Sequence, residues 1–283
     1  MKRMSAAMLM VALVAGCGNQ QASQTIKVKG SDTELNLVQS FAEHYMESHP
    51  SAMVSVLGGG SGTGIAALIN GEVDIANSSR PMKDKEKEDA RARGVEPTEF
   101  VVASDAIAII VSNDNQVSDI SGENLGKLFR GEVRNWKEIG GPDAPVSLYG
   151  RQSNSGTYVF FQEEALGGDY SADMKQMNGN AQIVEGIKSD RAGIGYVGLG
   201  YVMKDGKFTT DVKVLKLDGK LPGEDGYRLF RNLFQYVSGK PQGAVKDFLA
   251  YELSDEAQKI VEEVGFIPIT STPAMEKSRK VLE

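Results

Sequence analysis

The first eighty residues of the chain repeat one arrangement, in which a short apolar strand runs into a polar loop and a helix follows. Residues 25–29 alternate in polarity as a strand does, and further apolar runs stand at residues 52–57 and 73–76. Between these runs, apolar side chains recur at helical spacing, as over residues 37–45. Strands separated by helices predict a parallel α/β sheet, because parallel neighbours need a long crossover. The polar loops at the strand ends should then meet in one crevice; they are residues 30–34, 58–64 and 77–80.

A fourth polar loop, residues 151–157, stands between an apolar run and a helix-like segment. Arg151 supplies a fixed cation, Ser155 and Thr157 supply hydroxyl donors, and Gly156 lets a ligand approach the backbone. The N–H groups at a helix start add donors and a partial positive charge. The same residues also suit an ordinary N-cap, where Ser and Thr are preferred. The three similar loops upstream favour an anion site between this loop and theirs.

Two long apolar segments predict that the chain passes between two lobes. Residues 100–111 are strongly β-prone and lead out of the first lobe, and residues 229–237 lead back. We therefore expect lobe I to comprise residues 25–106 and 232–283, and lobe II to comprise residues 107–231. Helical patterns fall at residues 121–130, 182–188, 242–253 and 255–264.

The N-terminus has the features of an export signal. Lys2 and Arg3 precede an apolar run at residues 8–14 that is too short to span a bilayer. Small residues then lead to Cys17, the only cysteine, in a pattern that resembles the lipobox of bacterial lipoproteins. This predicts a signal peptide over residues 1–16, a lipidated (palmitate-bearing) Cys17 and a polar tether over residues 17–24. The alternative is an ordinary secretory signal with a chance cysteine.

The charge balance excludes some partners. The chain has 31 Lys plus Arg against 38 Asp plus Glu. Without residues 1–16, which hold Lys2 and Arg3, 29 positive residues face 38 negative ones, for a net charge of −9. A nucleic-acid surface would need a basic patch, so no nucleic-acid partner is expected. An anion site in this chain must rely on local donors rather than on the overall field.

The sequence contains two apparent motifs of cofactor binding or catalysis, but each lacks a feature that the motif requires. Gly193-x-Gly195-x-x-Gly198 has the spelling of a dinucleotide fingerprint but does not open a helix. Ser61 lacks the G-x-S-x-G elbow, because Thr63 stands where glycine is needed. The only histidines, His44 and His49, lie together near the end of a predicted helix, and we interpret them as surface residues. No spacing of His, Cys and carboxylate residues suggests a zinc site. We expect no enzyme activity, no cofactor and no metal.

With these loops in place, the chain resembles the PstS family, the phosphate-binding proteins of bacterial phosphate ABC transporters. The resemblance covers residues 25–270. Its most specific pieces are residues 30–33, 59–64, 73–80 and 193–198, and Arg151 with Ser155, Gly156 and Thr157. It implies a two-lobed periplasmic-binding-protein fold (type II), each lobe a mixed, mainly parallel sheet flanked by helices, with two crossing strands. It also implies a monomer that passes phosphate to a membrane-embedded ABC permease. The lipid anchor would hold this monomer at the membrane.

The resemblance further implies a site in which dehydrated phosphate is held only by hydrogen bonds between the lobes. The residues so implied are Ser31, Asp32, Thr33, Ser61 and Ser79 from lobe I, and Arg151, Ser155, Gly156 and Thr157 from lobe II.

One departure concerns Ser79, because a branch of the family has an aspartate there that accepts the proton of hydrogen phosphate and so rejects sulfate. Asp32 is our candidate for this acceptor, and the alternative is that Asp32, or Ser31, serves as an N-cap. Arg80 either adds charge to the site or pairs with Asp74 or a neighbour, and we favour pairing.

The resulting expectation is an exported, lipid-anchored binding protein for inorganic phosphate. Hydroxyls and helix N-termini do not choose between tetrahedral oxyanions, so sulfate, molybdate and tungstate stay as alternatives. An exported phosphate-ester hydrolase, or an adhesin or sensor on the same fold, are further alternatives. A hydrolase would need a metal cluster or a nucleophile–base pair, and the sequence displays neither.

Overall fold

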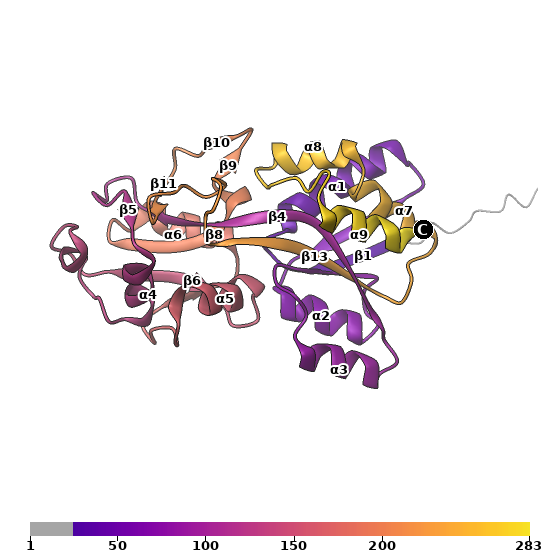
Figure 1. Ribbon diagram of the computed structural model, residues 1–283, viewed down its shortest axis with the longest axis horizontal. Coiled ribbons are helices and arrows are strands. Elements are labelled where there is room, and N and C mark those ends of the chain that lie inside the picture. Colours follow the sequence, from indigo (N-terminus) through magenta and orange to yellow (C-terminus); the bar gives the residue numbers. More distant parts are fainter. Residues whose placement is uncertain (1–24) are drawn as a thin grey trace, which may run out of the picture.

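The computed structural model describes residues 25–283, so the predicted signal peptide and the lipidated tether lie outside the described residues. Two long antiparallel strands run through the molecule side by side and connect its two halves (Figure 1). They are β4 (Pro97–Val111) and β13 (Phe230–Ser238), paired from Phe230 opposite Ala106 to Ser238 opposite Pro97. The prediction of two crossing strands is confirmed.

The first half contains the predicted parallel sheet. β1 (Thr25–Gly30) lies between β2 (Met53–Leu57) and β3 (Ile75–Ser78) and is parallel to both, and β13 joins β3 in antiparallel pairing. Helices surround this sheet (Figure 1); they are α1 (Leu35–Ser48), α2 (Ser61–Ile69), α3 (Asp84–Ala92), α7 (Gly243–Glu252), α8 (Asp255–Glu263) and α9 (Pro273–Leu282). The first eighty residues therefore form the βαβαβ unit that their pattern predicts.

The second half builds its sheet on the other end of β4. β8 (Gly193–Gly198) pairs antiparallel with β4, and β6 (Ser147–Arg151) lies parallel between β8 and β7 (Lys175–Met177). The helices are α4 (Gly122–Arg130), α5 (Gly156–Phe161) and α6 (Asn180–Ser189). Short elements complete it: β5 (Asp119–Ile120), β9 (Met203–Lys204), β10 (Lys207–Phe208), β11 (Lys213–Val214), β12 (Lys216–Leu217), the 3₁₀ turns Trp136–Ile139 and Leu199–Tyr201, and a π turn at Gln162–Leu166. The glycine-rich segment is a buried strand inside the sheet and opens no helix, as predicted.

Each half has its own hydrophobic core. One cluster of buried side chains includes Phe41, Phe100 and Phe248, and the other includes Phe129 and Trp136. β4 contributes to both clusters and is buried from residue 100 to residue 111, as expected for a strand covered on both faces. Trp136 is a packing residue: it is fully buried, and its Nε1 donates to the carbonyl of Ala192 at 2.9 Å.

None of the helices within residues 25–283 has both the length and the apolar character needed to cross a membrane.

Candidate functional site

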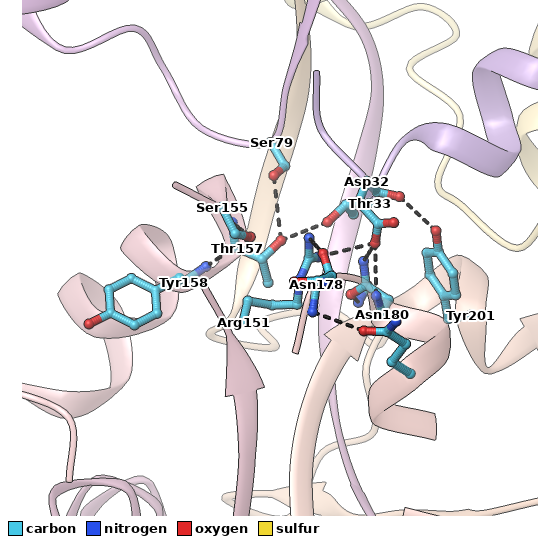
Figure 2. A network of polar contacts seen from close by, with 12 residues as sticks. Asp32, Thr33, Ser79, Arg151, Ser155, Thr157, Tyr158, Asn178, Asn180 and Tyr201 are labelled. Atoms are coloured by element: carbon cyan, nitrogen blue, oxygen red, sulfur yellow. Dashed lines mark hydrogen bonds and ion pairs between the residues drawn. The ribbon is translucent and has the colours of Figure 1, made fainter. Parts of the chain in front are cut away.

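Polar loops from both halves of the molecule meet beside the crossing strands. Thr33 Oγ1 lies 2.6 Å from Thr157 Oγ1, and Ser79 Oγ lies 3.4 Å from the same atom (Figure 2). Ser61 Oγ lies 3.4 Å from Ser79 Oγ and accepts a hydrogen bond from Ser79 N at 3.1 Å. All four hydroxyl-bearing residues are buried. The structure thus brings together four side chains that lie far apart in the sequence.

Gly156 makes the close approach of these loops possible. It is the first residue of α5, and a Cβ added there would lie 2.4 Å from Ser61 Oγ and 2.7 Å from Ser79 Oγ. Any side chain at this position would therefore displace the Ser61 and Ser79 hydroxyls from their present positions. Ser155 caps the same helix, since its Oγ accepts from Thr157 N at 3.2 Å and Tyr158 N at 3.4 Å. The N-cap interpretation of Ser155 is confirmed, and its ligand role stays a prediction.

Arg151 ends β6 with its guanidinium buried at the centre of the site, at 1% exposure. Its Nη2 donates to the carbonyl of Asn178 at 2.9 Å, and its Nη1 lies 3.2 Å from Asp32 Oδ1 (Figure 2). Nε and Nη1 have no hydrogen-bond partner among the described residues. Burial lowers the pKa of Arg151, and the Asp32 carboxylate opposes that shift. Asp32 lies within ion-pair distance of Nη1 but is not aligned for a hydrogen bond, and a guanidinium remains charged in proteins, so Nε and Nη1 can both donate to an anion.

Asp32 belongs to the site and not to the start of α1. Its Oδ1 accepts from Asn180 N at 2.8 Å and from Asn180 Nδ2 at 2.6 Å, while its carbonyl accepts from Tyr201 OH at 2.6 Å (Figure 2). The residue before α1 is Glu34, which makes no side-chain capping bond. The expectation that Ser31 or Asp32 caps this helix is therefore wrong, because Asp32 turns to donors from the other half of the molecule.

Arg80 pairs with a neighbour, as favoured, but the partner is Glu86 of α3 and not Asp74. Arg80 Nη1 and Nη2 donate to the two carboxylate oxygens of Glu86 at 2.8 and 2.6 Å. Asp74 instead accepts from Lys27 N at 2.8 Å. Burial raises the pKa of Glu86, but hydrogen bonds from Arg80 and from Lys83 N outweigh burial and lower it. The Arg80 charge is thus neutralised by a bidentate pair.

The sequence reasoning missed a second arginine at the site. Arg231 of β13 donates from Nη2 to Thr157 Oγ1 at 3.0 Å and from Nη1 to the carbonyl of Ser79 at 3.1 Å. Its partner is Asp105 of β4, with Oδ2 2.8 Å from Nη2 and 3.1 Å from Nε. The sequence held a signal for this pair, because the apolar runs at residues 100–111 and 229–237 each contain a single charged residue, and the two are of opposite sign. Such charges are rarely buried unless they are paired.

Within the part of the chain that the structure describes, no histidine is among the contacts of this site. Ser61 Oγ contacts Ser79, which is not a base. His44 and His49 are exposed on α1 and just beyond it. Within residues 25–283, no group of three or more His, Cys, Asp or Glu side chains is arranged to hold a metal ion.

Two α/β lobes, joined by crossing strands and facing each other with polar loops, define a solute-binding protein that holds its ligand between the lobes. In agreement, residues 16–256 match the model of the PBP superfamily domain. The chain is 34% identical over 254 residues to the phosphate-binding protein PstS of Bacillus subtilis strain 168, covering 89% of this chain and 83% of the relative. It is 31% identical over 323 residues to the phosphate-binding protein PstS of Pseudomonas aeruginosa PAO1, covering 100% and 99%. The chain belongs to the PstS family of the PBP superfamily.

Solved structures give the same fold. A candidate phosphate ABC transporter substrate-binding protein from Clostridium perfringens, solved with bound phosphate, superposes with a TM-score of 0.80 at 25% identity, covering 87% of this chain and 100% of the other. An ABC-type phosphate transport receptor from Vibrio cholerae gives a TM-score of 0.68 at 27% identity, covering 86% and 99%. The predicted fold class is thereby confirmed.

Proposed function

We propose that this protein is an extracytoplasmic solute-binding protein that captures inorganic phosphate between its two lobes and delivers it to an ABC permease. The observation that carries the proposal is the buried Arg151 guanidinium, whose Nε and Nη1 have no hydrogen-bond partner among the described residues, in a site with hydroxyls from both lobes. The names of its relatives and structural neighbours support phosphate as the ligand. The site offers donors and no nucleophile–base pair, so its chemistry is binding rather than bond breaking.

The phosphate contacts come from both lobes in this proposal. Ser31, Asp32, Thr33, Ser61 and Ser79 act from lobe I, and Arg151, Ser155, Gly156 and Thr157 act from lobe II. The Ser31 hydroxyl is buried and makes no hydrogen bond of good geometry among the described residues, so it can turn from the nearby Glu34 carboxyl group to an anion. Asp32 serves as the acceptor of the phosphate proton. Sulfate has no such proton at neutral pH, and it would leave that acceptor unmatched in a buried site.

The organisation of the chain follows from the same proposal. Lobe I comprises residues 25–106 and 232–283, and lobe II comprises residues 107–231; the two hydrophobic cores support this division. Residues 1–16 act as a signal peptide, and Cys17 carries the lipid that anchors the protein outside the cytoplasm. The protein acts as a monomer and catalyses no reaction.

Calorimetry tests the ligand directly. The chain from residue 17 onward, with Cys17→Ser to prevent lipidation, is unfolded and refolded to remove bound ligand, then titrated with phosphate, sulfate, molybdate and tungstate. Tight phosphate binding with at least about tenfold weaker binding of the other three is expected, because one unmatched buried acceptor costs about 1–3 kcal/mol. Tight sulfate binding without phosphate binding would contradict the assignment of phosphate as the ligand.

A further inference from the structure

An ion pair lies buried between the two crossing strands, where the lobes join. Asp105 of β4 and Arg231 of β13 stand opposite each other in the strand register and are 0% and 5% exposed. Two hydrogen bonds hold them, from Nη2 and Nε of Arg231 to Oδ2 of Asp105. Replacing a buried ion pair by apolar residues is often neutral or stabilising, so the pair is weak evidence for a role in stability alone. Its contacts indicate what else it does.

The pair reaches into both lobes. Arg231 Nη1 donates to the Ser79 carbonyl, which belongs to the loop after β3. Arg231 Nη2 also donates to Thr157 Oγ1, at the start of α5. Asp105 Oδ1 accepts from Leu199 N at 2.9 Å, just after β8. Two of these three contacted groups, the Ser79 carbonyl and Thr157 Oγ1, thus belong to residues of the proposed phosphate site.

The direction of these hydrogen bonds fixes the role of the Thr157 hydroxyl. A guanidinium only donates, so Thr157 Oγ1 must accept from Arg231. The single proton of that hydroxyl is then directed away from Arg231, to Thr33 Oγ1 at 2.6 Å, to Ser79 Oγ at 3.4 Å or to a ligand. A hydroxyl free to rotate could instead turn its lone pairs toward an anion, which would be repulsive. Arg231 therefore occupies one lone pair of the Thr157 hydroxyl and leaves its proton for a neighbouring hydroxyl or the anion.

Asp105 determines the orientation of the Arg231 guanidinium and compensates its charge. Because Oδ2 of Asp105 takes two bonds from the guanidinium, the guanidinium is fixed in orientation and its charge is compensated locally. Burial raises the pKa of Asp105, and Arg231 opposes that shift. The pair therefore orients neighbouring groups without adding net positive charge to the site.

We propose that Arg231, held by Asp105, is a positioning residue for anion binding, which acts through Thr157 and the Ser79 loop. The proposal rests on the function proposed above and adds a residue of the crossing strands to it. Arg231 touches Thr157 and the Ser79 backbone, and it exerts its effect on the anion through them.

A double-mutant cycle with inorganic phosphate tests this role. Its arms are wild type, Thr157→Val, the compensated pair Asp105→Asn with Arg231→Met, and the triple variant. Removing a charge-assisted hydrogen bond is expected to weaken phosphate binding about tenfold or more in the compensated pair. In the Thr157→Val background the same change should weaken binding by less than about threefold, because the hydroxyl it orients is already gone. Thermal unfolding and circular dichroism report whether each variant folds.

Additive effects of the two changes would overturn the proposal, because a merely structural pair would weaken binding equally in both backgrounds. Unchanged phosphate affinity in the compensated pair would also overturn it. If the compensated pair does not fold, Arg231→Lys replaces it, with the same coupling to Thr157→Val expected and additivity again contradicting the role. The matched control is the exposed ion pair of Arg191 and Asp114, 2.8 Å apart, whose Arg191→Met with Asp114→Asn should leave affinity unchanged. A wild type that binds no phosphate would instead refute the proposed function, and the inference with it.

Discussion

Arg151 is the residue whose loss should reduce phosphate binding most. Arg151→Ala removes the two unpartnered donors and leaves the Asp32 carboxylate without its cation beside the anion. Truncating one partner of a buried charged pair costs about 2–5 kcal/mol, so affinity should fall by about 30-fold or more. Calorimetry measures this loss, with the exposed Arg134→Ala as control. A loss below about threefold would contradict the central place of Arg151.

Asp32→Asn tests which residue distinguishes phosphate from sulfate. The amide oxygen of Asn could still accept from Asn180, while its N–H₂ group would replace one acceptor oxygen by a donor. Phosphate binding should weaken and sulfate binding should strengthen, so the ratio of the two affinities should fall about tenfold or more, as expected for one mismatched buried group. Competition calorimetry measures the ratio. An unchanged ratio would mean that the acceptor role belongs to another residue.

At the scale of the elements, local sequence patterns predicted the strands, helices and loops. They did not predict side-chain contacts between residues far apart in the sequence. The strands, the helices and the loops that meet at the site follow from hydrophobic periodicity, which is a local property. The role of Asp32 depends on Asn180, about 150 positions away, and so a rule for helix capping gave the wrong answer. The pairing of Asp105 with Arg231 depends on strand register, which alternation alone does not specify. The meeting of the loops that carry the proposed site residues could be predicted, because these loops follow strand ends and their convergence follows from topology.

Helix α7 carries a buried acid that should make stability depend on pH. Glu252 is fully buried, and its Oε1 accepts from Gln235 Nε2 of β13 at 3.0 Å. Burial raises its pKa to about 8, and the Gln235 bond opposes the shift. The folded state therefore keeps this proton between the ordinary pKa of a glutamic acid, about 4.3, and about 8. In that window the folded state binds more protons than the unfolded state, so stability falls as pH rises.

Glu252→Gln should remove the contribution of Glu252 to the loss of stability as pH rises. Glutamine copies the neutral acid in shape and can still accept from Gln235. The variant should match wild type near pH 5 and exceed its free energy of unfolding near pH 8, by at most about 1.4 kcal/mol per pH unit of the window. Denaturant unfolding at both pH values measures the difference. Burial also raises the pKa of Glu34, so the comparison must be with wild type at each pH. Parallel pH profiles for the two proteins would show that Glu252 titrates normally.

At the scale of the whole molecule, direct contacts hold the two halves together on either side of the site. On one side, Asn154 Nδ2 donates to the Gly59 carbonyl at 3.0 Å and to Thr63 Oγ1 at 3.1 Å, and Gly62 N donates to the Asn154 carbonyl at 3.0 Å. On the other side, Asp32 is bonded to Asn180 and Tyr201 (Figure 2). The lobes in this structure are therefore closed on each other, and these contacts belong to the closed state.

Asn154→Ala should destabilise the closed state without touching the proposed phosphate contacts. Asn154 is exposed at the rim, and its side chain makes two hydrogen bonds, each worth about 0.5–1.5 kcal/mol. Because these bonds form only after the lobes meet, the phosphate dissociation rate should rise about fivefold or more while the association rate stays the same. Stopped-flow measurements on the chain with a reporter dye would separate the two rates. Gln152→Ala, an exposed neighbour on the same loop, is the matched control. A slower association with unchanged release would mean that the rim contacts form before phosphate is enclosed, and closure would then precede capture instead of following it.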